Sequence, residues 1–123
     1  MTNPMQDDAE VAYVQEVTAL ATDLIATDDP YQVGLDIHGV SAHASMEAEP
    51  AGFMWLIWGA LTDWIELKPD ESAQAAAEMV RAAREWLALD LADREAVGGY
   101  LDYWVHDVCG YARRAGSGGR GPR

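Results

Sequence analysis

The stretch from residue 53 to residue 65 constrains the fold more than any other part of the chain. Its only polar side chains are those of Thr62 and Asp63. A helix that is apolar on nearly every side must be covered on every side. The apolar run is too short to span a bilayer. We therefore expect a helix over residues 51–67 at the buried centre of the fold.

Four further segments have apolar residues at helical spacings of three and four, which predicts amphipathic helices around that centre. Each also carries a start signal, either an acidic or serine cap or a proline in the first turn. The expected helices are residues 7–27 with Asp7 as cap and Glu10 completing a capping box, 30–44 with Asp29 as cap, 72–89 with Asp70 or Ser72 as cap, and a last helix to about residue 111 with Asp90 or Asp93 as cap.

Two local features leave alternatives open. Val33, Leu35 and Ile37 also fit the period-two pattern of a strand, but a lone strand would have no partner in this chain, so we expect a helix. Gly98-Gly99 weakens the last helix by about 1 kcal/mol per glycine relative to alanine. The pair therefore marks either a break or a point of tight contact. Similarly, Gly59 leaves room for the backbone of a neighbouring helix.

These patterns predict an all-α chain with a single domain. We expect a bundle of about five helices around the buried helix 51–67, with the domain covering residues 7–115. Residues 1–6 are expected to fray, and residues 116–123 form a flexible tail rich in glycine and arginine.

The charge of the chain is strongly acidic and uneven. The net charge is −13, and residues 1–67 hold twelve acidic residues without one lysine or arginine. Binding to a nucleic-acid backbone requires a basic face, so direct nucleic-acid binding is disfavoured. The single cysteine excludes an internal disulfide. There is no pattern of a signal peptide or a membrane span, so we expect a cytoplasmic protein without membrane association.

Carboxylates that no cation offsets repel one another, so the acidic half favours a partner that supplies positive charge. Two kinds of basic protein fit: a toxin or nuclease inhibited by an acidic cognate protein, or a DNA-binding protein blocked by a surface that mimics phosphates. Simple solubility is the other interpretation of this charge. The expected partner-binding residues are Asp7, Asp8, Glu10, Glu16, Asp23, Asp28, Asp29 and Asp36.

Few residues suggest catalysis or metal binding. Asp102 and His106 lie four residues apart, which is the spacing of a carboxylate that orients an imidazole. Cys109 lies near His106 and is weighed as a nucleophile against a buried apolar role. His43 and Glu47 have the spacing of a metal-ligand pair on a helix. The chain contains no P-loop, dinucleotide, serine-hydrolase, HExxH or CxxC motif. We therefore predict no catalytic residue, metal or cofactor.

The tryptophans are a second group of candidates. Five tryptophans against one phenylalanine is a skewed choice, and an indole N–H needs a hydrogen-bond partner. We expect Trp55 and Trp58 in the core and at least one of Trp64, Trp86 and Trp104 at a surface or pocket rim. Asp63 and Glu66, beside Trp64, complete the expected rim.

Three functions remain in competition. The leading hypothesis is a non-enzymatic interaction protein that binds a basic protein partner through the acidic helices. The rival is an enzyme or small-ligand binder with a pocket between helices. It requires four side chains to converge on one cavity: His38, His43, Asp102 and His106. The third is a homodimer or larger homo-oligomer joined through apolar area left over on helix 51–67.

Overall fold

A computed structural model describes residues 4–44 and 51–111 of the chain. This part forms five α-helices and no strand, which confirms the all-α prediction. The helices are α1 (Pro4–Ala26), α2 (Pro30–His43), α3 (Ala51–Leu67), α4 (Ser72–Ala88) and α5 (Arg94–Asp102). A 3-10 turn, Pro69–Glu71, joins α3 to α4, and a π-helical segment, Tyr103–Val108, continues α5. No helix in these ranges is both long and apolar enough to cross a membrane.

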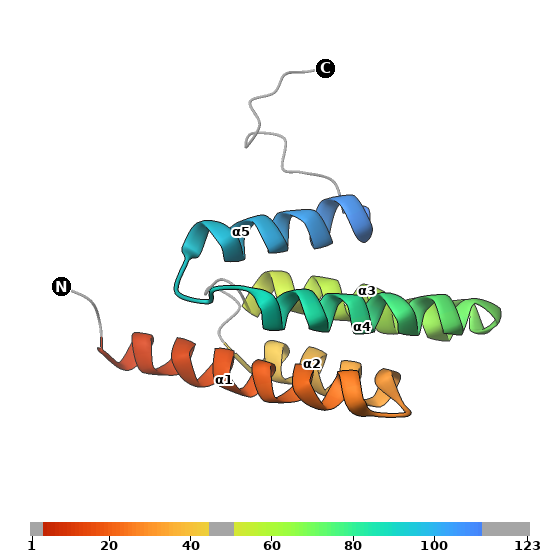
Figure 1. Cartoon of the computed structure of the whole chain (residues 1–123), viewed down its shortest axis with the longest axis horizontal. Coiled ribbons are helices and arrows are strands. Elements are labelled where there is room, and N and C mark those ends of the chain that lie inside the picture. The colour runs from red at the N-terminus through yellow and green to blue at the C-terminus, as the bar shows by residue number, and fades with distance from the viewer. Residues whose placement is uncertain (1–3, 45–50, 112–123) are drawn as a thin grey trace, which may run out of the picture.

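The first four helices pack as a bundle whose neighbours run in opposite directions (Figure 1). In sequence order each helix contacts the next, and α1 also contacts α4 to close the bundle. The fifth helix lies above α3 and α4, on the side away from α1 and α2 (Figure 1). Short connections at the α1–α2 and α3–α4 corners enforce the antiparallel order.

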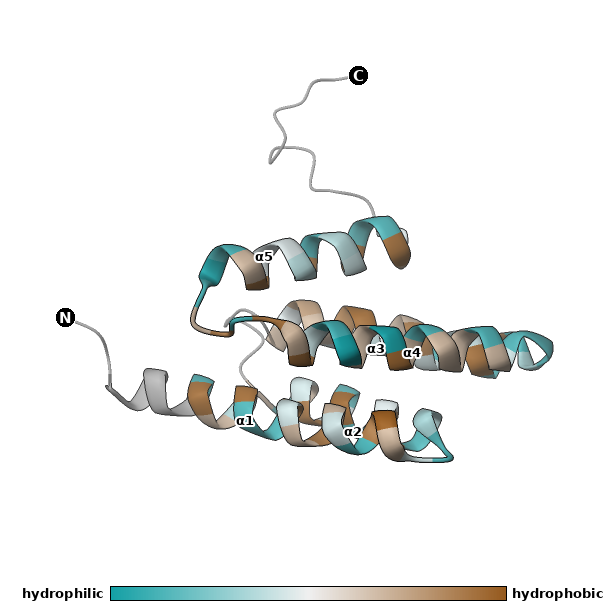
Figure 2. Ribbon diagram, viewed as in Figure 1, coloured by the Kyte–Doolittle hydropathy of each residue, from teal (hydrophilic) through white to brown (hydrophobic). Residues whose placement is uncertain are grey.

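The central helix is α3, as predicted. Met54, Ile57, Trp58 and Leu61 are each at most 2 % exposed. They occur at spacings of three and four and face α2 and α4, which both contact α3. Figure 2 shows the complementary pattern, with hydrophilic residues gathered around the corner between α3 and α4.

Close approach between α2 and its neighbours depends on Gly34. A Cβ at this position would lie 2.7 Å from the Met79 Cε atom and 3.3 Å from the Thr62 Cγ2 atom. Both neighbours are buried, and Met79 belongs to α4. The Met79 Cε atom ends a flexible side chain, but Met79 is fully buried, and in a close-packed interior its displacement would disturb other contacts.

Aromatic side chains and one arginine attach the last helix to α4. Trp104 is fully buried and donates its indole N–H to a Glu85 carboxylate oxygen at 2.8 Å. The Arg81 guanidinium carbon lies 4.4 Å from the Trp104 ring centroid, and Arg81 also binds Glu78 and Glu85, as the i+3 and i+4 spacing predicts. Trp86 and Tyr100 make an edge-to-face contact beside them.

Several helix starts differ from the caps that the sequence predicts. The Asp29 side chain accepts the Gln32 N–H, and Asp93 accepts two N–H groups at the start of α5, so these two predictions are confirmed. The Asp7 cap is wrong, because α1 begins at Pro4. The cap at Asp70 or Ser72 is also wrong, because the preceding 3-10 turn makes Glu71 the N-cap, without a side-chain bond.

The glycine pair in α5 is neither a break nor a tight contact. The helix continues through Gly98-Gly99, and a Cβ at either position would meet nothing within 4 Å. The irregularity lies further on, where the Cys109 N–H bonds to the Trp104 carbonyl five residues back, as in a π-helix. Gly110, with φ at +83°, then ends the helix.

Two glycines of α2 provide a matched test of this packing. Gly34→Ala is expected to destabilise the fold by about 1–3 kcal/mol, because the added methyl overpacks a filled core. Gly39→Ala, on the same helix with nothing within 4 Å of a Cβ, is expected to stabilise it by about 0.5–1 kcal/mol through helix propensity. Urea unfolding of both variants measures the difference. Equal effects of the two substitutions would contradict the close approach at Gly34.

Candidate functional site

The cavity between α2 and α3 is the best candidate for a functional site. Its volume is about 360 Å³. One stripe of α3, at spacings of three and four residues, forms its long wall: Trp55, Gly59, Thr62 and Glu66. The remaining lining residues are Leu35, His38, Leu56, Asp63 and Tyr111. The same regular helix thus covers the core with one face and a cavity with another.

An aromatic pair forms part of the lining of this α2–α3 cavity. The His38 imidazole stacks on the Trp55 indole, with ring centroids 5.4 Å apart and an interplanar angle of 22°. A Cβ at Gly59 would lie 3.2 Å from the His38 Nε2 atom, so the glycine leaves room for the imidazole. The space beside Gly59 therefore receives a histidine side chain and not, as the sequence suggested, a neighbouring backbone.

Carboxylates gather at the other end of the cavity. The Tyr31 hydroxyl donates a hydrogen bond to a Glu66 carboxylate oxygen. This bond raises the pKa of Tyr31, and the charges of Glu66, Asp63 and Asp29 raise it further. Three negative charges from the α1–α2 corner and the end of α3 therefore act on one phenol.

The lining residues favour a cationic ligand. Among the described residues, no lysine or arginine lines the cavity, while two carboxylates and two stacked rings do. Aromatic faces and carboxylates both attract ammonium and guanidinium groups. Thr62, which also lines the cavity, is buried and donates its hydroxyl to the Trp58 carbonyl at 2.8 Å.

The structure describes the side chains of six of the eight predicted partner-binding acids, and they lie in four places. Glu16 and Asp23 lie exposed on α1, Asp28 and Asp29 at the α1–α2 corner, and Asp36 on α2. Glu10 lies 4.0 Å from Arg94 of α5 and belongs to a different surface. The side chains of Asp7 and Asp8 lie outside the described part of the structure.

The four residues of the rival pocket hypothesis lie on different parts of the described structure. Only His38 lines the α2–α3 cavity. His43 is exposed at the end of α2. His106 lies 3.8 Å from Asp102, and its Nδ1 atom is 2.7 Å from the Tyr111 carbonyl oxygen. Tyr111, which lines the cavity, thus links the two histidine environments.

Metal binding gains no support within the described ranges. No three histidine, cysteine, aspartate or glutamate side chains there are placed to hold a metal ion. The predicted ligand Glu47 lies in the segment 45–50, outside the described residues, so the pair that it would form with His43 is not described.

The tryptophans divide between the core and two cavities. Trp86 and Trp104 are buried, and their indoles donate to Thr18 and Glu85. Trp64 is half-buried beside Ala60, Leu61 and Cys109 at a separate cavity, and donates to Glu71 at 2.7 Å. Trp55, which the sequence assigned to the core, instead lines the site. The signal that could have found it is its i+4, i+7 and i+11 alignment with Gly59, Thr62 and Glu66.

Comparisons of this chain with protein-family models, with curated proteins and with solved structures find no match. The geometry of the chain itself is therefore the basis for a functional proposal.

Cys109 has the environment of a protected thiol. It is half-buried beside α3, and burial, with a smaller contribution from Glu78, raises its pKa from 9.0 to about 11. Because the thiolate is the nucleophile, a raised pKa lowers reactivity at neutral pH.

The alkylation rate of Cys109 tests this assignment. At pH 8, iodoacetamide should react about 100-fold more slowly with the native thiol than with the urea-unfolded chain, since two pH units of pKa change the thiolate fraction by that factor. The native rate should rise about tenfold per pH unit up to pH 10. A plateau of the native rate below pH 9 would show a reactive, activated cysteine instead.

Proposed function

We propose that this protein is a non-enzymatic interaction protein that binds a basic protein partner, and that the α2–α3 cavity receives a cationic side chain of that partner. The observation that carries the proposal is the combination of the His38–Trp55 stack with Asp63 and Glu66 in one cavity. Its described lining contains no lysine or arginine.

An arginine fits this combination better than other side chains do. Its planar guanidinium stacks on aromatic rings and pairs with carboxylates through fixed N–H groups. A cation over an aromatic ring is worth about 0.5–2 kcal/mol, depending on its desolvation. Anchors of this kind, seated in a central pocket, dominate the binding energy of many protein interfaces.

The exposed acids outside the cavity support the proposal in a different way. Glu16, Asp23, Asp28 and Asp36 lie on or between the two helices that precede α3. Exposed charges outside a binding pocket mainly increase the association rate of a partner of opposite charge. They have less effect on the dissociation rate. We therefore divide the roles, with the cavity holding the partner and the acids of α1 and α2 steering it.

A partner of this chemistry fits both classes that the charge suggests. A basic toxin or nuclease and a DNA-binding protein each present arginines on their active surfaces. In either case the protein would act as an inhibitor by covering those arginines, and we place this association in the cytoplasm.

Two double variants with equal charge change test the proposal. Asp63→Asn/Glu66→Gln alters the cavity, and Glu16→Gln/Asp23→Asn alters α1; each removes two negative charges. Affinity capture from the native host at low salt is expected to recover a basic partner with the wild type and the α1 variant and to lose it with the cavity variant. Washing with about 0.5 M salt should release it, because salt screens exposed charges.

Kinetics on the recovered partner separates the two roles. The cavity variant should dissociate at least about tenfold faster, while the α1 variant should mainly associate more slowly and with a weaker dependence on salt. Equal losses in both variants would show that bulk charge alone governs the association and would contradict an anchor in the cavity. Capture of no basic protein at low salt would contradict the proposed function as a whole.

A further inference from the structure

A second cavity lies on the opposite side of the bundle from the site described above, between α1 and the α4–α5 junction. Its volume is about 300 Å³, at the lower end of the range of about 300–1,000 Å³ for small-molecule pockets. Its lining is mixed, with polar and apolar parts of similar extent. The apolar part comes from five side chains: Val14, Trp86, Leu91, Val97 and Leu101. We call it the α1–α5 cavity.

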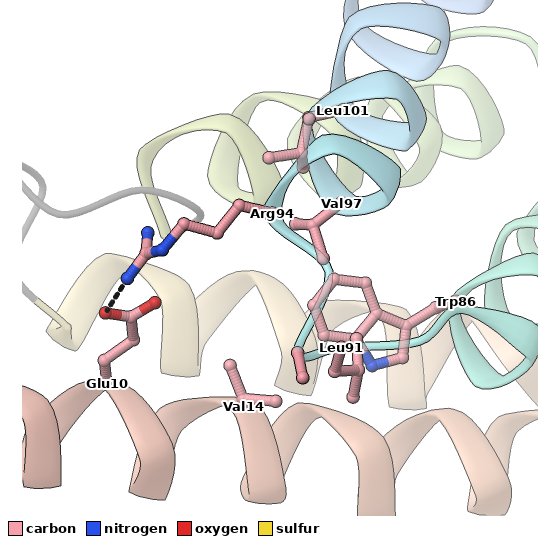
Figure 3. A pocket seen from close by; sticks show the side chains of 9 residues that line it. Glu10, Val14, Trp86, Leu91, Arg94, Val97 and Leu101 are labelled. Atoms are coloured by element: carbon pink, nitrogen blue, oxygen red, sulfur yellow. Dashed lines mark ion pairs between the residues drawn. The ribbon is translucent and has the colours of Figure 1, made fainter.

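Two opposite charges stand at one end of the α1–α5 cavity. Figure 3 shows Arg94 reaching from the start of α5 toward Glu10 on α1, with Val14, Leu91 and Trp86 farther along. The Arg94 and Glu10 side chains approach to 4.0 Å. This separation is too long for a hydrogen bond, and no other hydrogen bond or ion pair of either group occurs among the described residues. Within the described part of the structure, the hydrogen-bonding groups of both side chains are therefore open to a ligand.

The Trp86 ring forms a rigid part of the apolar wall. Trp86 is 1 % exposed, and its indole N–H is already bonded to the Thr18 hydroxyl at 3.1 Å, so its ring is fixed. The charged end is adjustable, because the Arg94 side chain is 87 % exposed. A preformed apolar wall with a few convergent polar groups is the usual composition of a small-molecule site.

We infer that the α1–α5 cavity binds a free apolar amino acid as its zwitterion. Arg94 would pair with the α-carboxylate, Glu10 would accept from the α-ammonium group, and the apolar side chain would lie against Trp86, Leu91 and Val97. The α-ammonium and α-carboxylate groups of an amino acid are attached to the same carbon. They can therefore pair with the neighbouring Glu10 and Arg94 side chains at the same time. A ligand with one charge would leave either Glu10 or Arg94 without a partner.

A glycine in the cavity wall provides a sharp test. Gly98 lines the cavity, whereas its neighbour Gly99 does not. A Cβ at either position meets nothing within 4 Å, so both sites accept a side chain without a clash, and leucine raises helix propensity at each. Gly98→Leu should fill the cavity, and Gly99→Leu is its matched control.

The experiment is a titration of the isotope-labelled full chain with L-leucine, followed by the amide NMR shifts of residues 10–14 and 91–98. We expect saturable shifts with a Kd of about 1 mM or below. L-Leucine methyl ester and N-acetyl-L-leucine, which each lack one charge, should bind at least about tenfold more weakly. Arg94→Gln and Glu10→Gln should weaken leucine binding by a similar factor, Gly98→Leu should abolish it, and Gly99→Leu should leave it unchanged.

Four outcomes would overturn the inference. These are the absence of saturable shifts with leucine, equal binding of the methyl ester or the N-acetyl compound, and unchanged binding by the Gly98→Leu variant. The fourth is a shift of the same amides with protein concentration alone, which would show that a second copy of the chain occupies the cavity.

Discussion

The burial of α3 is the constraint on which the rest of the structure depends. A helix with so few polar side chains is stable only when other helices cover it, and α2 and α4 do so from two sides. The cover is close because Gly34 lets α2 approach Met79 and Thr62. At about 25 cal/mol per Å² of apolar surface removed from water, such contacts outweigh the local preferences of the surrounding helices.

The candidate site follows from the same helix. One edge of α3 departs from the apolar pattern, where Thr62, Asp63 and Glu66 occur near its end. Thr62 turns its hydroxyl to the α3 backbone, but Asp63 and Glu66 remain exposed beside Tyr31. The cavity therefore joins apolar side chains of α3 to two exposed carboxylates, one of which accepts the Tyr31 hydroxyl of α2.

The positions of the helices could be predicted from the sequence, but the cavity between them could not. Helix α3 begins and ends at the expected residues because its apolar run and its flanking prolines are local signals. The Asp29 cap is equally local. The His38–Trp55 stack joins residues of different helices, and no spacing within one helix predicts which face α2 turns to α3. The π-helical segment after Asp102 was not predicted either. Within it, Trp104 is buried and donates its indole N–H to Glu85 of α4, a contact between helices that no local spacing reveals.

The central claim is that the α2–α3 cavity is a site for a cationic side chain. The most direct measurement is an NMR titration of the isotope-labelled protein with L-argininamide. This probe has the guanidinium group of arginine but no carboxylate. The account predicts saturable shifts of the Trp55 indole N–H and of the Gly59 and Glu66 amides, with only small shifts at Glu16 and Asp23 on α1. Shifts that are as large at Glu16 and Asp23 as in the cavity, and that grow without saturation, would contradict it.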